Sequence, residues 1–382
     1  MDHVQAPIIP VVGGWIRETP GTISLGQGVV HYGPPREAID AVREALERPS
    51  THEYGDGAGI PPLVRAIRDK LLRENGIDVG HGSDIMVTAG ANMAFMHAVL
   101  AITAPGDEVI LPVPFYFNHE MAIEMAGCRV VRVPTDEHYQ LRVDLIERAM
   151  TDRTRAVVTI SPNNPTGAVL SEASLRAVNE LCRTRGLYHL ADEPYEYFVY
   201  GDARHVSPGS FPDAADYTIS MYSLSKAYGF AGWRVGYMAY PKALAAAMMK
   251  AQDTILINPT IASQVGAVAA LRIGRAHAAP HVRELESIRK MVVAELSALG
   301  RLATVPAADG AFYCLLRVNT TMEPMVVGER LVREHQVAVV PGSAFGMHDG
   351  CYFRVAYGAL QKATVAEGVG RLVRGLRAIL GA

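Results

Sequence analysis

Apolar residues in the middle of the chain form short runs that alternate with segments of helical spacing. The first such segment places Leu63, Ile67 and Leu71 three or four positions apart, on one face of a helix. The runs that follow predict strands at 84–88, 108–112, 156–160 and 187–191. Strands and helices that alternate in this way are typical of a mostly parallel α/β sheet.

Beyond about residue 280 the pattern changes to a mixed order of helices and strands. It predicts a helix at 281–299, a strand at 312–318, a helix at 325–335, strands at 337–340 and 352–356, and a final helix. The first 45 residues are rich in proline and glycine, so we expect them to be irregular and to pack on this C-terminal part.

A chain of 382 residues exceeds the usual size of one hydrophobic core, so we expect two domains. We assign residues 46–280 to a large α/β domain with three layers, α/β/α, around the mostly parallel sheet. Residues 1–45 and 281–382 are expected to form a smaller α+β domain.

The composition is that of an ordinary globular protein, with 49% hydrophobic and 20% charged residues. A formal net charge of -3, without a long run of lysine and arginine, indicates neither a nucleic-acid-binding nor a membrane-binding surface. The four cysteines are far apart and form no C-x-x-C pair, so neither a zinc ribbon nor a disulfide framework is indicated. Small soluble ligands are the expected partners.

The N-terminal residues carry no basic region, and prolines and glycines interrupt their apolar stretch, unlike a signal peptide. No uncharged apolar stretch approaches the roughly 20 residues that span a bilayer. These features predict a cytoplasmic protein.

The segment from Ser223 to Gly236 combines a lysine with serines, glycines and an arginine. The amine of Lys226 can form a Schiff base with an aldehyde. The hydroxyls of Ser223 and Ser225 and the guanidinium of Arg234 can hold a phosphate dianion beside it. An isolated S-x-S-K is more often an exposed lysine in a loop, but the arginine and glycines favour a pyridoxal 5'-phosphate site.

Further segments follow predicted strands, where open α/β sheets bind ligands. The turn Gly90-Ala91-Asn92 opens a helix whose backbone N–H groups can hold phosphate. Tyr116, after the strand at 108–112, offers an aromatic face on which a pyridine ring can stack. An ordinary turn and simple packing are the competing explanations for these two segments.

Two more strand ends and one strand interior carry polar side chains. Asn164 can donate to the phenolic oxygen of the cofactor, and Asp192 can pair with a protonated pyridine nitrogen. Arg354 stands inside an otherwise apolar strand and could bind an α-carboxylate through two parallel hydrogen bonds. A salt bridge at an edge strand is the competing explanation for Arg354.

Together these ordered segments resemble the class I and II aminotransferases, such as aspartate aminotransferase, among the fold-type I pyridoxal phosphate enzymes. The resemblance implies that fold, an N-terminal segment over the active site, and amino transfer between an L-amino acid and a 2-oxo acid by a ping-pong mechanism. It implies Lys226, Asp192 and Tyr195 as catalytic residues. The implied cofactor-binding residues are Lys226, Gly90, Ala91, Asn92, Tyr116, Asn164, Asp192, Tyr195, Ser223, Ser225, Arg234 and Tyr54.

Tyr54 matches a family tyrosine that reaches the phosphate of the neighbouring subunit, so the resemblance implies a symmetric homodimer. The segment after Gly28 departs from the family, because Val29 to Pro35 stand where many relatives carry a proline and an acid before an aromatic residue. We expect this segment to shape the substrate pocket. The substrate contacts expected in the pocket are Arg354, Gly28, Asn164, Tyr32 and Trp15.

Alternatives to amino transfer stay open. The same cofactor and fold support β-elimination at a sulfur amino acid and oxidative deamination of an amino acid such as arginine. A ligand-sensing regulator is a remote alternative, since the N-terminal residues lack a recognition-helix pattern. His277 and His281 have metal-ligand spacing, but Pro280 is expected to interrupt the helix and no acidic partner stands out, so we expect a surface pair and no metal.

Overall fold

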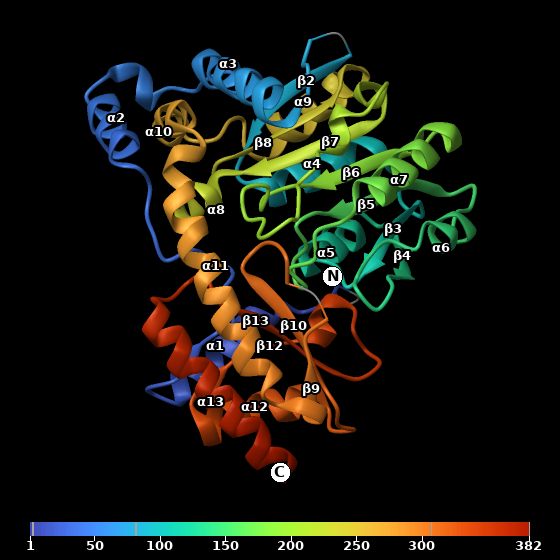
Figure 1. Ribbon diagram of the computed structural model, residues 1–382. Coiled ribbons are helices and arrows are strands. Elements are labelled where there is room, and N and C mark those ends of the chain that lie inside the picture. The colour runs from blue at the N-terminus through green and yellow to red at the C-terminus, as the bar shows by residue number, and fades with distance from the viewer. Residues whose placement is uncertain (2–3, 81, 307, 382) are drawn as a thin grey trace.

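The structure, a computed structural model, describes residues 1, 4–80, 82–306 and 308–381. A seven-stranded sheet lies in the larger, upper part of the molecule and a four-stranded sheet in the lower part (Figure 1). The long helix α11 (Arg275–Ser297) runs along one side from the upper part to the lower part (Figure 1).

The large sheet has the strand order β2-β8-β7-β6-β5-β3-β4. Its strands are β2 (Ser83–Thr88), β3 (Glu108–Val113), β4 (Arg129–Pro134), β5 (Thr154–Ile160), β6 (Tyr188–Asp192), β7 (Thr218–Ser223) and β8 (Gly236–Pro241). Strand β8 runs antiparallel to both of its neighbours, β2 and β7, and all the other pairs of these strands are parallel. The predicted mostly parallel α/β sheet is therefore confirmed.

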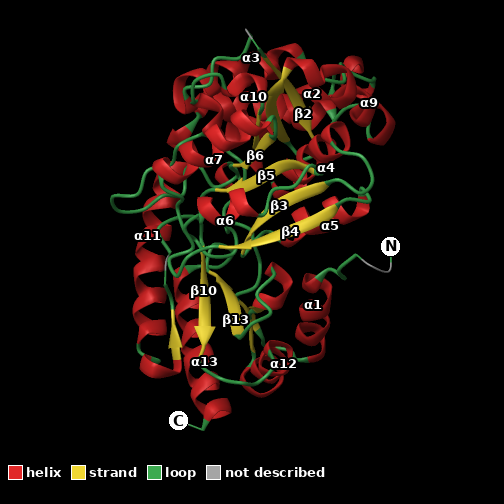
Figure 2. Cartoon of the chain, turned by 90° about the vertical axis from the view of Figure 1, so that its right-hand side faces the viewer, coloured by secondary structure: helices red, strands yellow, loops and turns green. Residues whose placement is uncertain are grey.

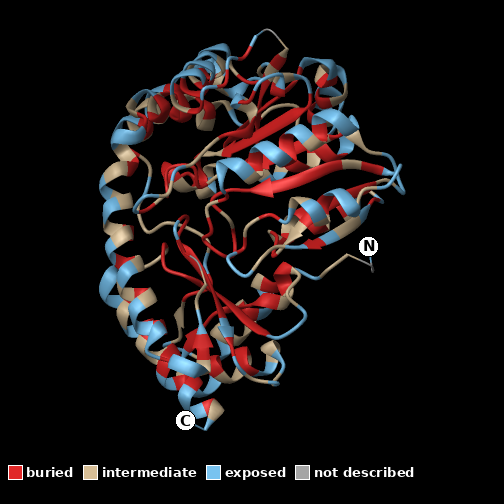
Figure 3. Cartoon of the chain, turned by 45° about the vertical axis from the view of Figure 1, so that its right-hand side comes forward, coloured by how far each residue is buried: buried red, intermediate tan, exposed pale blue. Residues whose placement is uncertain are grey.

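Helices cover both faces of this sheet, and its central strands are buried between them (Figures 2 and 3). Side chains alternate between the faces, because Val109 and Leu111 of β3 join one hydrophobic cluster and Ile110 joins another. The first face carries α4 (Ala91–Ile102), α5 (Phe117–Met125) and α9 (Ala245–Ile255). The second carries α3 (Pro61–Lys70), α6 (Val143–Arg148), α7 (Glu172–Arg185) and α10 (Ile261–Ile273).

The lower part contains an antiparallel sheet of order β12-β13-β10-β9. Its strands are β9 (Ala303–Thr304), β10 (Tyr313–Val318), β12 (Val340–Pro341) and β13 (Cys351–Ala356). A separate parallel pair joins β1 (Ile23–Ser24) to β11 (Val337–Ala338). The single strand predicted at 337–340 is therefore wrong, because the backbone passes from one sheet to the other at Val339. Helices α12 (Pro324–His335) and α13 (Lys362–Leu380) pack on these strands.

The first 45 residues contain α1 (Ile8–Glu18) and most of α2 (Arg36–Leu46), so the prediction of an irregular segment is wrong. Pro10 lies in the first turn of α1, where proline is tolerated, and Ile8 and Val12 are buried one turn apart. Helix α1 packs on α12, whereas α2 packs on α10. The domain boundaries at residues 45 and 280 stay a prediction.

Helix α11 begins at Arg275 and contains Pro280, so the predicted helix start at residue 281 is wrong. Proline removes one backbone hydrogen bond from a helix interior. Buried residues on both sides of it, among them Ala278 and Leu285, hold the helix together through tertiary packing. His277 and His281 consequently lie on one continuous helix.

No helix in the described ranges has the length and apolar character needed to cross a membrane. All four cysteines are buried and free of disulfides. The absence of a disulfide framework agrees with the spacing of the cysteines in the sequence.

Candidate active site

The predicted motifs meet at one edge of the large sheet because parallel strands end on the same side. They line one common pocket. Ten of the residues expected to bind the cofactor line this pocket, namely Ala91, Asn92, Tyr116, Asn164, Asp192, Tyr195, Ser223, Ser225, Lys226 and Arg234. Ile160 and Pro194 also line it.

One end of the pocket combines the start of α4 with the short helix α8 (Leu224–Ala227). Gly90 precedes α4 with a φ of 84°, and a Cβ there would collide with the Arg234 guanidinium. Arg234 donates to the Ala89 carbonyl at 3.0 Å and contacts the Ser225 hydroxyl at 3.5 Å. The Ser223 hydroxyl accepts from the Ser225 N–H at 3.1 Å. Helix-start N–H groups, two hydroxyls and a guanidinium fit a phosphate.

Lys226 lies in α8, and its Nζ donates to the Gly28 carbonyl at 2.6 Å. Burial, together with the nearby Arg354 and Arg234, lowers the pKa of Lys226 to about 8, while Asp192 opposes this shift. A substantial fraction of the amine is therefore neutral near pH 8. The neutral amine is the form that attacks an aldehyde.

Asp192 ends β6 in a buried position. Its Oδ2 lies 3.1 Å from Nε2 of His119, whereas its Oδ1 is buried without a hydrogen-bond partner among the described residues. A buried carboxylate oxygen without a partner costs free energy. This oxygen fits a cationic donor, and the protonated ring nitrogen of pyridoxal phosphate is one.

His119 is absent from the predicted site. It lies on α5, three residues after Tyr116, and its ring stacks on Phe95 with centroids 4.0 Å apart. Its ring also meets Tyr116 edge to face, with centroids 5.4 Å apart. Residues three apart share a helix face, so the spacing from Tyr116 is the one sequence signal that could have identified His119.

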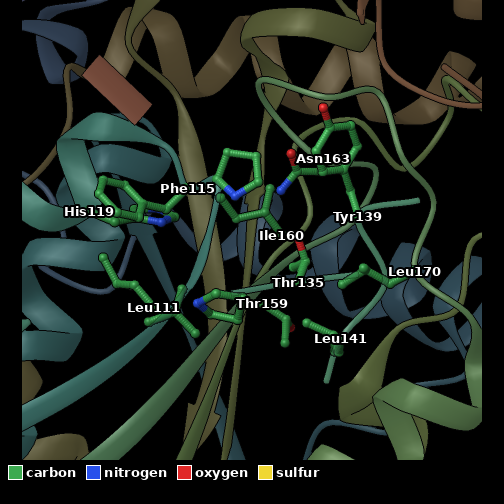
Figure 4. Close-up of a pocket in the computed structure, with 13 residues that line it drawn as sticks. Leu111, Phe115, His119, Thr135, Tyr139, Leu141, Thr159, Ile160, Asn163 and Leu170 are labelled. Atoms are coloured by element: carbon green, nitrogen blue, oxygen red, sulfur yellow. The ribbon is translucent and has the colours of Figure 1, made fainter. Parts of the chain in front are cut away.

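A second, smaller cavity lies beside His119, near the ends of β3 and β5 (Figure 4). Leu111, Phe115, Ile160 and Leu170 make much of its lining apolar (Figure 4). A charged amino acid or a phosphate is poorly solvated in such surroundings. The charged ligands therefore belong in the pocket with Lys226.

Asn164, Tyr195 and Tyr313 form a chain of hydrogen bonds. The Asn164 amide donates to the Tyr195 hydroxyl at 3.4 Å, and the hydroxyls of Tyr195 and Tyr313 lie 2.9 Å apart. Burial raises the pKa of Tyr195 well above its usual value, so this phenol stays protonated. Tyr313 comes from β10 and is missing from the predicted site, because the sequence does not reveal which strands of the two sheets meet.

Arg354 lies in β13 with only 2% of its surface exposed. It donates to the Asn164 side-chain oxygen at 2.9 Å and to the Gly26 carbonyl at 2.7 Å, while its Nε is buried without a partner. Strand β13 lies between β12 and β10, and Arg354 forms no ion pair with an acidic side chain in the described ranges. A buried cation without a counter-charge suits an anionic substrate group better than it suits an edge-strand salt bridge.

The N-terminal segment reaches the pocket at Gly28, whose carbonyl accepts from Lys226. A Cβ at Gly28 would lie 2.8 Å from the Tyr313 hydroxyl, so a side chain there would disturb the tyrosine pair. Tyr32 does not line the pocket. Its hydroxyl instead donates to the Lys226 backbone carbonyl at 3.1 Å.

The remaining predicted residues also lie away from the pocket lining. Trp15 of α1 packs against a hydrophobic cluster that contains Phe345, and Tyr116 packs against the same cluster. Tyr54 is 84% exposed and borders a surface hollow with Asn258 and Ile261. Neither residue touches Lys226 within the single chain, so their expected roles stay predictions.

Comparison with known proteins agrees with this geometry. The model of the family "Aminotransferase class I and II" matches residues 20–372. A probable aspartate/prephenate aminotransferase of Aquifex aeolicus is 37% identical over 94% of this chain and 91% of its own length. An aromatic aminotransferase of Arabidopsis thaliana is 33% identical over 98% of this chain and 94% of its own length.

The solved structure of an aromatic aminotransferase from Pyrococcus horikoshii has a TM-score of 0.90 and 33% identity to this chain. The match covers 97% of this chain and 100% of that one. The lysine, the unpartnered carboxylate oxygen and the phosphate-binding groups described above fit the cofactor of such enzymes. The chain therefore belongs to the class I and II aminotransferases, fold-type I enzymes that use pyridoxal phosphate to move amino groups between amino acids and 2-oxo acids.

Proposed function

We propose that this aminotransferase prefers L-amino acids with aromatic or other large apolar side chains and transfers their amino group to a 2-oxo acid. The observation that carries the proposal is the apolar surface beside Arg354. Tyr116 and Phe345 belong to one hydrophobic cluster with Phe117 and Trp15. The Phe345 ring centre lies 5.1 Å from the Arg354 guanidinium. Of these residues Tyr116 lines the pocket and Phe345 is fully buried behind it, so Tyr116 is the ring that the side chain of an amino acid bound through Arg354 would meet.

Aspartate and aromatic aminotransferases both stand among the similar proteins, so their names do not decide the preference. An acidic side chain is the main competitor. An acidic side chain needs a cationic partner when it is buried. The described residues that line the pocket offer Lys226 and Arg234 as cations, and both have other roles in the proposal.

We assign the cofactor contacts as follows. Asp192 holds the proton on the ring nitrogen, and His119 orients the Asp192 carboxylate. Asn164 and Tyr195 donate to the phenolic oxygen, and Tyr116 stacks on the ring. The phosphate group binds the start of α4 together with Ser223, Ser225 and Arg234.

Pyridoxal phosphate supplies the electron sink that makes the Cα–H bond of a bound amino acid labile. With the cofactor and an amino acid bound, the Lys226 amine, whose pKa is lowered to about 8, would serve as the group that accepts and releases the proton of the substrate Cα. Arg354 orients the substrate through its α-carboxylate. The buried surroundings of Asn164 and Tyr195 keep water away from these groups.

We further propose a symmetric homodimer in which Tyr54 reaches the phosphate of the partner's site. An exposed aromatic side chain beside a surface hollow suits an interface. The four free cysteines suit a reducing compartment, so we place the enzyme in the cytoplasm. In sedimentation experiments the protein should behave as a dimer, and Tyr54→Phe should raise the dissociation constant for the cofactor.

The test of the substrate proposal is a set of half-reactions. Enzyme loaded with pyridoxal phosphate is mixed with one amino acid at a time, and absorbance follows conversion of the cofactor to its pyridoxamine form. Phenylalanine, tyrosine and leucine should convert the enzyme faster than aspartate at equal concentration. Faster conversion by aspartate would contradict the proposal. Release of ammonia without an added 2-oxo acid would instead indicate elimination or oxidation.

A further inference from the structure

A group of three histidines, a tyrosine and a glutamate lies outside the active-site pocket, where the N-terminal segment meets α11. His31 and Tyr32 come from the segment that follows Gly28, and His277, His281 and Glu284 come from α11. Because α11 continues through Pro280, the last three residues lie one turn apart on one helix face. The acidic partner that the sequence did not reveal is Glu284.

We propose that His31, His281 and Glu284 bind a divalent transition-metal ion of the zinc type. One ligand atom from each residue lies within 4.8 Å of the other two. His31 Nε2 and Glu284 Oε2 are 3.5 Å apart. This separation is close to the edge of a tetrahedral zinc site, about 3.4 Å for ligands about 2.1 Å from the metal. Imidazole nitrogens and a carboxylate oxygen are ligands that zinc accepts.

The surrounding rings hold the ligands in place. His281 stacks on Tyr32, with ring centroids 3.7 Å apart and an interplanar angle of 8°. Tyr32 is itself fixed by the hydrogen bond from its hydroxyl to the Lys226 carbonyl. Because these rings are ordered by packing, little conformational entropy remains to be lost when a metal binds.

The polar groups of the site favour a ligand. The side chain of His31 is only 10% exposed, and its Nδ1 is buried without a hydrogen-bond partner in the described ranges. Its Nε2 is the nitrogen that faces Glu284, so no hydrogen bond at Nδ1 competes with this orientation of the ring. A metal on Nε2 would bind the imidazole at the atom that already points toward the carboxylate. The Glu284 side chain is 39% exposed and gives the ion a path from solvent.

The bound ion would tie the N-terminal segment to α11. Three residues before His31, the Gly28 carbonyl accepts from the Lys226 amine. Metal binding would therefore hold the segment that reaches the active site, without any part in amino transfer itself. Two histidines and one glutamate supply three of the four ligands of a tetrahedral zinc ion, and water would supply the fourth. The site is therefore expected to bind the metal ion without a further organic molecule.

The experiment uses tag-free enzyme with its cofactor bound, stripped of metals with a chelator and desalted. Co²⁺ is then added as a spectroscopic substitute for Zn²⁺. The wild type should bind one Co²⁺ per chain and show the visible absorption bands of a four-coordinate site, and Zn²⁺ should displace it. His281→Gln and Glu284→Gln should each weaken Co²⁺ binding by at least about tenfold, since each removes a ligand.

The matched control is His138→Gln, which removes an exposed histidine beside the exposed Glu137. It should bind Co²⁺ like the wild type. The proposal is wrong if the stripped wild type binds no Co²⁺ with these bands, or if the His281 and Glu284 variants bind as tightly as the wild type. Glu284→Gln changes a partly exposed side chain, so it keeps the test valid if the His281 variant fails to fold. Thermal midpoints of the stripped variants check folding.

Discussion

The proposed cofactor side and the proposed substrate side of the active site are built in different ways. The cofactor side comes from the ends of neighbouring strands of one sheet, so the packed core fixes Asp192 and Ser223 directly. The substrate side is assembled from Gly28, Tyr313 and Arg354, which lie far apart in the sequence. This difference suggests that the bond chemistry is tied to the rigid sheet, whereas substrate preference can change through the surrounding segments.

Hydrogen bonds join the two sides at a few points. Arg354 donates to Asn164, and the Tyr313 hydroxyl meets that of Tyr195. Lys226 donates to the Gly28 carbonyl. If the two sides have the separate roles proposed for them, substitutions on the cofactor side should reduce kcat, and those on the substrate side should mainly change KM.

The largest effect is expected for Lys226→Ala on the cofactor side. Activity should fall by about a thousandfold or more, because the variant loses both the covalent anchor and the acid-base group. The visible absorption band of the bound cofactor should also change. Exposed Lys242→Ala is the control and should leave both unchanged. A variant that keeps the wild-type band would contradict the assignment of Lys226.

The next effect concerns the ring-nitrogen partner. Asp192→Asn should lower kcat by about a hundredfold with little change in KM, because a neutral amide cannot stabilise a protonated ring nitrogen. His119→Asn should act in the same direction but more weakly, since His119 would act on the ring nitrogen only through the Asp192 carboxylate. Steady-state kinetics on folded protein measure both. A rise in KM alone would place Asp192 in substrate binding instead.

On the substrate side, Arg354→Lys should raise KM for both the amino acid and the 2-oxo acid by about tenfold, because one ammonium cannot reproduce a two-point contact. The value of kcat should change less. Arg317→Lys on the neighbouring strand β10 is the control, because Arg317 is exposed. Equal KM values in the Arg354 variant and the wild type would break the division between the two sides.

The smallest expected effect is a change in the pKa of Lys226 on the cofactor side when the charge of Arg354 on the substrate side is removed. In enzyme freed of cofactor, the rate of pyridoxal phosphate capture should rise with pH and level off above about pH 8, because the pKa of Lys226 is lowered to about 8 and the neutral amine attacks. Arg354→Met removes a positive charge that lowers this pKa, so the midpoint should move to higher pH. Rapid-mixing absorbance across pH measures the shift. A midpoint that moves to lower pH would contradict the role of Arg354.

The cofactor side was the more predictable from the sequence. Asn164 comes four residues after the end of β5 and Asp192 ends β6, so the shared direction of these two neighbouring strands brings them together. His119 and Tyr313 were missed because their roles depend on contacts between elements that no local pattern reveals. Helix α1 and the early start of α11 were missed for a related reason, since tertiary packing outweighs the local signals of proline and glycine.

The close approach of Gly90 to Arg234 has a consequence for how the phosphate site could evolve or be redesigned. Any side chain at position 90 needs the space that the guanidinium fills, and it would also adopt an unfavourable φ. A side chain at position 90 would push the guanidinium away from its place at the phosphate site. The unfavourable φ would remain whatever residue stands at position 234, so a second change there would not restore the site.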